Sequence, residues 1–272
     1  MIFVKPDIYS FKNEEQEEIP VDWEGYLVVY EKPYKDGQWT IGVDVVEGVE
    51  GGDYANITVY DRFNKSVAAV YWSRIDEVGL AKVVKLVQEY FTPDSENHEP
   101  SWVGIETNGP GLATFDIAVE LGVDNLFLAP RYDVVNGGVT YKKGWRTDTN
   151  SRNELIAGIK AWLIDRAGAM NSHRLCGECM TFVRSKTGKP LAKAGCHDDM
   201  VFGLGICIQV DEIVPLDEKV EKPKKLTYSD IVGPKAIWEE VPELAPQDRC
   251  FEQAVIHQSI FQNRDFDDML DG

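Results

Sequence analysis

Two acidic side chains stand where a buried strand would ordinarily be apolar. Asp44 interrupts the most hydrophobic predicted strand, residues 39–46, and Glu106 directly follows another, residues 102–105, just before a glycine turn. An ionised carboxylate inside a strand is costly unless something compensates its charge. A bound cation is a compensation that also supplies chemistry. For either acid taken alone, a solvent-facing position at a strand edge is the alternative explanation.

A third group of acids opens the last predicted helix, residues 197–210, which is apolar on all sides after its first turn. This helix begins His197-Asp198-Asp199. One Asp at a helix N-terminus caps free N–H groups and suits the helix dipole. Two in succession are more than capping requires. Asp53, which follows two glycines and opens the second predicted strand, is a further candidate that turn formation explains equally well.

Carboxylates from two strands and a buried helix form an oxygen-rich site of the kind that Mg²⁺ or Mn²⁺ prefers. Two such ions activate a water molecule and stabilise the leaving oxygen in phosphodiester hydrolysis. In this interpretation Asp44 bridges both ions, Glu106 binds one of them, and Asp199 or Asp198 binds the other. We favour Asp199 as the direct ligand and predict these acids, with Asp53 nearby, as the catalytic residues.

The elements that must hold these acids follow from hydrophobic periodicity. Apolar and alternating runs predict an antiparallel meander of strands at 39–46, 54–60 and 66–72, and further strands at 102–105 and 125–129. Helical spacing predicts helices at 76–91, 112–121, 150–167 and 197–210, a short element at 176–183 and a hairpin at 186–193. The expected fold is α/β, a mixed five-stranded sheet of three meander strands and two parallel strands with helices on both faces.

Length and composition bound the organisation of the chain. Its 272 residues are 43% hydrophobic, which is enough for a real core, and they allow one large domain or two small ones. No run approaches the roughly 20 apolar residues of a membrane helix, and the N-terminus lacks a signal-peptide pattern. Five cysteines, an odd number, favour a reducing compartment. We expect a folded domain at 25–212, an acidic arm at 1–24, and a linker with an acidic tail at 213–272.

Five segments carry a family resemblance, in the order IGVDVVEGVEGGDYANITVYD, VGIETNGPG, GWRTDTNSRNELIAGIKAWL, TFVRSKTGKPLAKAG and CHDDMVFGLGI. Together they resemble the nuclease domain of the large terminase subunit of tailed bacteriophages, over about residues 25–210. The resemblance implies an RNase H-like fold and an endonuclease that cuts concatemeric double-stranded viral DNA at the start and end of genome packaging. It also implies metal binding by Asp44, Glu106 and one Asp of the HDD motif, with Asp53 matching a further acid near the site.

The same resemblance implies partners and a location. The partners are double-stranded DNA, a packaging ATPase domain, the portal and the small terminase subunit, and the location is the host cell cytoplasm, away from any membrane. The sequence shows no P-loop, because Gly188-Lys189 is preceded by Val183 where the first glycine should stand and followed by Pro190 instead of Ser or Thr. We therefore expect the ATPase on another polypeptide or separated from this chain.

The charge distribution indicates where DNA would bind. The chain has a net charge of −18, which argues against a surface that is basic throughout, yet residues 131–193 hold twelve basic and only five acidic residues. We expect phosphate contacts from Arg146 and Arg152 near the start of the 150–167 helix, and from Lys186, Lys189 and Lys193 around the hairpin. A solvated helix face with loops explains the same charges.

Several other interpretations stay open at this level. Cys176, Cys179, Cys196 and His197 suggest zinc, but Cys196 and His197 are adjacent, without the usual spacing between ligands. An ATP-binding fold of the actin and sugar-kinase group needs a longer chain. Another RNase H-like nuclease, such as a junction resolvase or a recombinase, and a non-catalytic module that docks DNA or the portal are the remaining alternatives.

Overall fold

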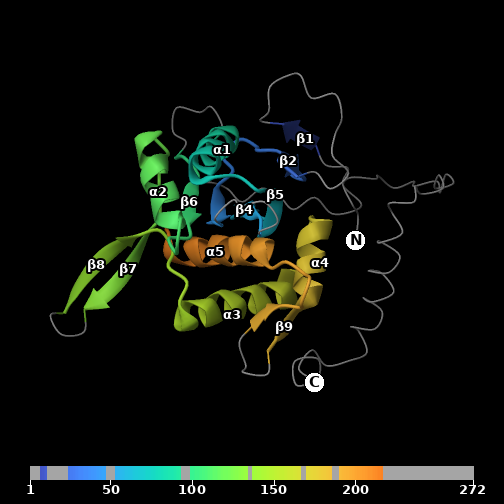
Figure 1. Cartoon of the computed structure of the whole chain (residues 1–272). Coiled ribbons are helices and arrows are strands. Elements are labelled where there is room, and N and C mark those ends of the chain that lie inside the picture. The colour runs from blue at the N-terminus through green and yellow to red at the C-terminus, as the bar shows by residue number, and fades with distance from the viewer. Residues whose placement is uncertain are drawn as a thin grey trace. The chain divides into compact units, whose positions relative to one another are not determined.

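A six-stranded mixed sheet forms the centre of the structure (Figure 1). The computed structural model describes residues 7–10, 24–46, 53–92, 99–133, 137–166, 170–185 and 190–216. The strands are β1 (Asp7–Ser10), β2 (Tyr26–Val29), β3 (Trp39–Asp44), β4 (Ala55–Asp61), β5 (Ser66–Ser73) and β6 (Trp102–Ile105), in the spatial order β1-β2-β5-β4-β3-β6. Neighbouring strands are antiparallel except β3 and β6, which are parallel.

The meander β3-β4-β5 and the parallel strand β6 confirm the predicted fold class. The expected strand at 125–129 is only a short parallel segment, in which Leu126 bridges Val103 and the N–H of Phe127 donates to the Val103 carbonyl at 2.8 Å. At the other edge, β1 and β2 extend the sheet beyond β5, and β1 comes from the stretch assigned from the sequence to an N-terminal arm.

Helices cover both faces of the sheet, as expected (Figure 1). One face packs against α1 (Glu77–Tyr90) and α2 (Gly111–Glu120), and the other against α3 (Thr149–Arg166), α4 (His173–Thr181) and α5 (Asp199–Ile213). The carboxylate of Asp76 caps α1 by accepting the N–H of Gly79 at 2.7 Å. No helix among the described residues is both long and apolar enough to cross a membrane.

Two short ribbons complete the described part. β7 (Leu128–Asp133) pairs with β8 (Gly138–Lys143), and every β8 side chain is exposed. β9 (Phe182–Arg184) pairs with β10 (Pro190–Ala192), as expected for a hairpin, and the residues between Ser185 and Pro190 lie outside the described ranges. The elements up to Phe182 and from Ala192 onward belong to one compact unit, and residues 183–191 belong to a second.

The side chains of β3 alternate between the two faces, and this alternation decides where Asp44 lies. Trp39, Ile41 and Val43 join the core beneath α1 and α2. The intervening residues therefore face α5. The hydroxyl of Thr40 donates to the carbonyl of Cys207 on α5 at 3.2 Å, and Asp44 ends the same row.

Glycines let α5 approach the sheet closely. A side chain at Gly42 would collide with the Gly203 carbonyl and with Cys207, and one at Gly203 would collide with Asn56 and Thr58 on β4. Since these positions lack a Cβ, the helix backbone lies directly on β3 and β4.

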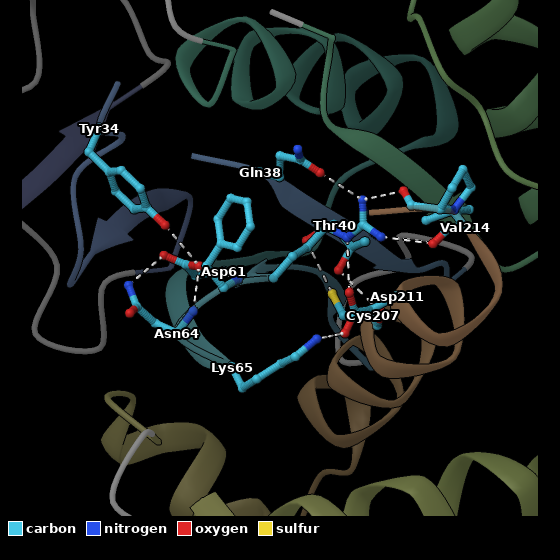
Figure 2. A network of polar contacts seen from close by, with 12 residues as sticks. Tyr34, Gln38, Thr40, Asp61, Asn64, Lys65, Cys207, Asp211 and Val214 are labelled. Atoms are coloured by element: carbon cyan, nitrogen blue, oxygen red, sulfur yellow. Dashed lines mark hydrogen bonds and ion pairs between the residues drawn. The ribbon is translucent and has the colours of Figure 1, made fainter. Parts of the chain in front are cut away.

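The far end of α5 is held by a buried arginine. Arg62 follows β4 and is 2% exposed. Its guanidinium donates to Asp211 at 2.9 Å and to the carbonyls of Val214 and Pro215 at 2.8 and 3.1 Å. Figure 2 shows Asp211 and Val214 in this network, where Lys65 also reaches Asp211. Arg62 thus satisfies carbonyl groups that the end of a helix leaves without partners.

We predict that Gly203→Ala destabilises the protein by about 1–3 kcal/mol, because the added methyl group overpacks the contact with Asn56, even though Ala favours helix by about 1 kcal/mol. Gly177→Ala on α4 is the matched control. A Cβ there meets nothing within 4 Å, so we expect a gain of up to about 1 kcal/mol. Urea unfolding measures both, and a Gly203→Ala variant as stable as Gly177→Ala would contradict the close approach.

Candidate metal centre

Two acids from parallel strands meet at one edge of the sheet. Asp44 is the last residue of β3 and Glu106 directly follows β6. Val43 and Ile105 are in parallel register, and the N–H of Glu106 donates to the Val43 carbonyl at 2.9 Å. Since parallel strands end at the same edge, the two carboxyl groups lie close together.

The first turn of α5 brings the other acids to this edge. Asp199 is 5% exposed, and its Oδ2 accepts the N–H of Tyr54, the residue just before β4, at 3.3 Å. Asp198 occupies the N-cap position, but its side chain makes no capping bond. Instead, its Oδ2 accepts the N–H of Ala192 at 3.2 Å. Capping therefore does not explain the pair of acids.

The acids raise one another's pKa. Burial raises the pKa of Asp44 well above its usual range, and the charges of Glu106, Asp199 and Asp198 raise it further. Burial, followed by the charge of Glu178, raises the pKa of Asp199 to about 7. Burial also raises the pKa of Asp198, while the N–H of Ala192 and the charge of Arg152 oppose that rise. The site holds excess negative charge that protons or a cation would relieve.

His197 completes a possible metal-binding group, although the sequence did not predict it as a ligand beside the acids. Nδ1 of His197 lies 3.6 Å from Oδ1 of Asp53 and 3.6 Å from Oδ2 of Asp199. In the described part of the chain, ligand atoms of these three residues lie within 4.8 Å of one another, and no cysteine belongs to this group. The position of His197 next to the acid pair was the signal in the sequence. Metal binding by a residue beside a helix N-cap, however, is not evident without the fold.

A second residue near the site, the buried acid Glu178, was also not predicted from the sequence. Glu178 on α4 is 6% exposed, and its Oε2 accepts the N–H of Met200, the residue after Asp199, at 2.8 Å. Burial raises the pKa of Glu178, and the N–H of Met200 and the charge of Arg174 oppose that rise. Nothing in the sequence marks this residue, because its relation to Asp199 depends on how α4 packs.

The basic residues predicted to contact phosphates are only partly described. Arg146, before α3, and Lys193, after β10, are exposed. Arg152 is half-buried in the first turn of α3, with its guanidinium carbon 4.3 Å from the centre of the Phe202 ring. Lys186 and Lys189 lie outside the described residues.

The architecture is similar to that of solved terminase nucleases. No protein-family model and no curated protein sequence matches this chain. The large terminase nuclease from thermophilic phage G20c, in structures with bound cobalt and with bound magnesium, matches with a TM-score of 0.51 and 16% sequence identity in each case. Each match covers 77% of this chain and 92% of the other. The nuclease domain of the large terminase from Thermus phage P74-26 matches with a TM-score of 0.46 and 17% identity, covering 66% of this chain and 83% of the other.

The sequence resemblance to large terminase nuclease domains thus agrees with a similarity in architecture. The match to the G20c nuclease extends over most of both chains, although few residues are identical. At this identity the comparison establishes architecture, and function has to be argued from the site itself. The chain has the RNase H-like fold of large terminase nuclease domains.

Proposed function

We propose that this chain is a metal-dependent endonuclease that cleaves concatemeric double-stranded viral DNA at the start and end of genome packaging, by two-metal-ion hydrolysis. The observation that carries the proposal is the meeting of Asp44 and Glu106 with the first turn of α5 at one edge of the sheet. The similarity to terminase nuclease structures, including one with bound magnesium, supports the choice of reaction.

The donor set suits a hard divalent cation. It offers mainly carboxylate oxygens, which Mg²⁺ and Mn²⁺ prefer, and the raised pKa values of Asp44 and Asp199 express a repulsion that a dication would relieve. Two bound ions would activate a water molecule and stabilise the leaving oxygen of the phosphodiester.

We assign the ligands by their neighbours. Asp44 is close enough to both Glu106 and Asp199 for their charges to raise its pKa, so we propose that it would bridge the two ions. Glu106 would complete one site. Asp199, with Asp53 and His197 within reach, would complete the other. Asp199 belongs to the group of neighbouring ligand atoms with Asp53 and His197, and Asp198 does not, so we propose Asp199 as the direct ligand.

The proposed DNA surface lies around the start of α3. Arg146 and Lys193 are exposed, and their charges would attract phosphates without reading sequence. Arg131 and Lys142 add to this surface, since the register of β7 and β8 places them on one face of the ribbon. Arg131 is also close enough to Asp148, just before α3, to contribute to the lowered pKa of that carboxyl, after the N–H groups of Ser151 and Asn150.

Asp44→Asn tests the bridging role. We expect cutting of plasmid DNA with Mg²⁺ or Mn²⁺ to fall at least about a thousandfold, because metal-ion catalysis supplies several kcal/mol. The melting temperature in EDTA should stay unchanged or rise, since the variant removes a buried acid from a cluster of acids. A folded, fully active Asp44→Asn variant would contradict the bridging role of Asp44.

Asp61→Asn is the matched control for Asp44→Asn, because it changes a buried acid at the end of β4. Its carboxylate accepts the N–H groups of Phe63 and Asn64 at 2.8 and 2.9 Å. We expect this variant to melt at a lower temperature and still cut DNA.

A wild type that leaves plasmid intact at every tested metal concentration rejects the nuclease function.

The pH dependence of stability tests the acid cluster in EDTA. The pKa of Asp199 is about 7 in the folded protein and near 4 in an unfolded chain, so its stabilising contribution is complete below about pH 4 and disappears as pH rises through about 7. Between these limits the wild type should lose on the order of 4 kcal/mol more than Asp199→Asn, measured by urea unfolding. Equal losses in the two proteins would contradict the raised pKa.

Salt dependence tests the DNA surface. Arg146→Ala/Lys193→Ala should weaken binding of a labelled duplex and reduce the slope of log K against log salt by roughly 0.9 for each phosphate that the variant no longer neutralises. Lys35→Ala/Lys82→Ala, which removes two exposed lysines elsewhere on the chain, is the charge-matched control. If both double variants show the same affinity and slope, Arg146 and Lys193 do not contact DNA.

A further inference from the structure

The first turn of α5 is capped by a neighbouring helix instead of by its own N-cap residue. The N–H groups of a first turn need acceptors, and an Asp at the N-cap position ordinarily supplies one. Asp198 holds that position without making the bond. Glu178 on α4 takes over this role, accepting the N–H of Met200 at 2.8 Å.

Glu178 is itself held in place by a stacked arginine. Its Oε1 lies 3.4 Å from Nε of Arg174, one helical turn earlier on α4. The guanidinium carbon of Arg174 lies 4.8 Å from the ring centres of both Tyr54 and Trp72. These contacts hold the guanidinium against two aromatic rings, and its charge in turn attracts the carboxylate of Glu178.

The same set of residues supports Asp199 from two directions. On one side, Glu178 holds the amide of Met200, which follows Asp199 directly. On the other, the N–H of Tyr54, whose ring contacts Arg174, donates to Oδ2 of Asp199 at 3.3 Å. The direction of the Asp199 carboxylate therefore depends on contacts that begin at Glu178 and Arg174.

Stability alone does not account for a carboxylate at this place. A buried ion pair contributes little net stability, because desolvation offsets most of the attraction. Glu178 also adds a negative charge next to a cluster of acids, and it is among the charges that act on Asp199. An acid kept where it repels its neighbours fits a role at the site.

We propose that Glu178 is a positioning residue of the metal centre, which orients the Asp199 carboxylate by holding the Met200 amide, and that Arg174 keeps Glu178 in this position. Glu178 touches neither the ion nor the DNA in this role. The proposal rests on the proposed metal-dependent function.

The test compares Mn²⁺ binding by Glu178→Ala and Glu178→Gln, measured by isothermal titration of the full chain without DNA. Residues that orient metal ligands typically contribute a factor of 10 to 100 in metal affinity, and we expect Glu178→Ala to bind Mn²⁺ more weakly by this factor. The amide oxygen of Glu178→Gln still accepts the Met200 N–H, so this variant should regain most of the affinity. Glu178→Ala with wild-type affinity, or Glu178→Gln as weak as Glu178→Ala, would overturn the positioning role.

A control variant separates positioning from general loss of stability. Glu31→Ala removes a carboxylate that accepts bonds from Ser66 and Asn171 at 2.6 and 2.7 Å. It should lower the melting temperature and leave Mn²⁺ affinity unchanged. If Glu178→Ala does not fold, Arg174→Gln replaces it, and wild-type Mn²⁺ affinity in Arg174→Gln then overturns the proposal.

Plasmid cleavage by the wild type, run in parallel, distinguishes this proposal from the nuclease function. A wild type that binds Mn²⁺ without cutting DNA rejects the nuclease but leaves the comparison of Glu178 variants valid. A wild type that cuts DNA, with unchanged Mn²⁺ affinity in Glu178→Ala, rejects the positioning role alone. A wild type that neither binds Mn²⁺ nor cuts DNA overturns both.

Discussion

The close approach of α5 to β3 and β4 is the constraint on which the rest of the structure depends. Gly42 and Gly203 leave no space for a side chain between helix and sheet. Asp44 lies two residues after Gly42, and Asp199 lies four residues before Gly203, one helical turn away. A larger residue at either glycine would lift the helix and separate the acids. Packing of backbone on backbone therefore fixes the geometry of the candidate metal centre, and the N-terminal end of α5 is where that geometry is used.

Bringing the acids together costs stability, which other parts of the fold offset. The raised pKa values of Asp44 and Asp199 mean that each carboxylate is less stable at the site than in water. The opposite end of α5 is held by Arg62, which is buried and donates to Asp211 and to the carbonyls of the two residues that directly follow the helix. A helix fixed at one end by a buried cation can present repelling anions at the other. This division between stabilising and functional ends is a common arrangement at strained sites.

The sequence predicted the acids that break a pattern and missed those that do not. Asp44 and Glu106 interrupt or end apolar strands, and the acid pair opens an apolar helix, so each stood out against its surroundings. The meander, β6 and the covering helices were predictable for the same reason. His197 and Glu178 join the site through the packing of separate elements, which periodicity does not encode. β1 lies in the stretch assigned from the sequence to an N-terminal arm, and its pairing with β2 was not predicted because that assignment rested on the acidic run that follows it.

The net charge of −18 is compatible with a DNA-cleaving enzyme once the positions of the charges are considered. Electrostatic forces between exposed charges fade over about 8–10 Å in physiological salt, so a phosphate backbone responds mainly to nearby groups. Around the start of α3 those groups are Arg146 and Arg152, with Arg131 and Lys142 on the ribbon. At longer range the chain repels DNA. A nuclease with this distribution would bind DNA weakly by itself and would depend on a partner to deliver its substrate, which suits the role proposed for it in a packaging machine.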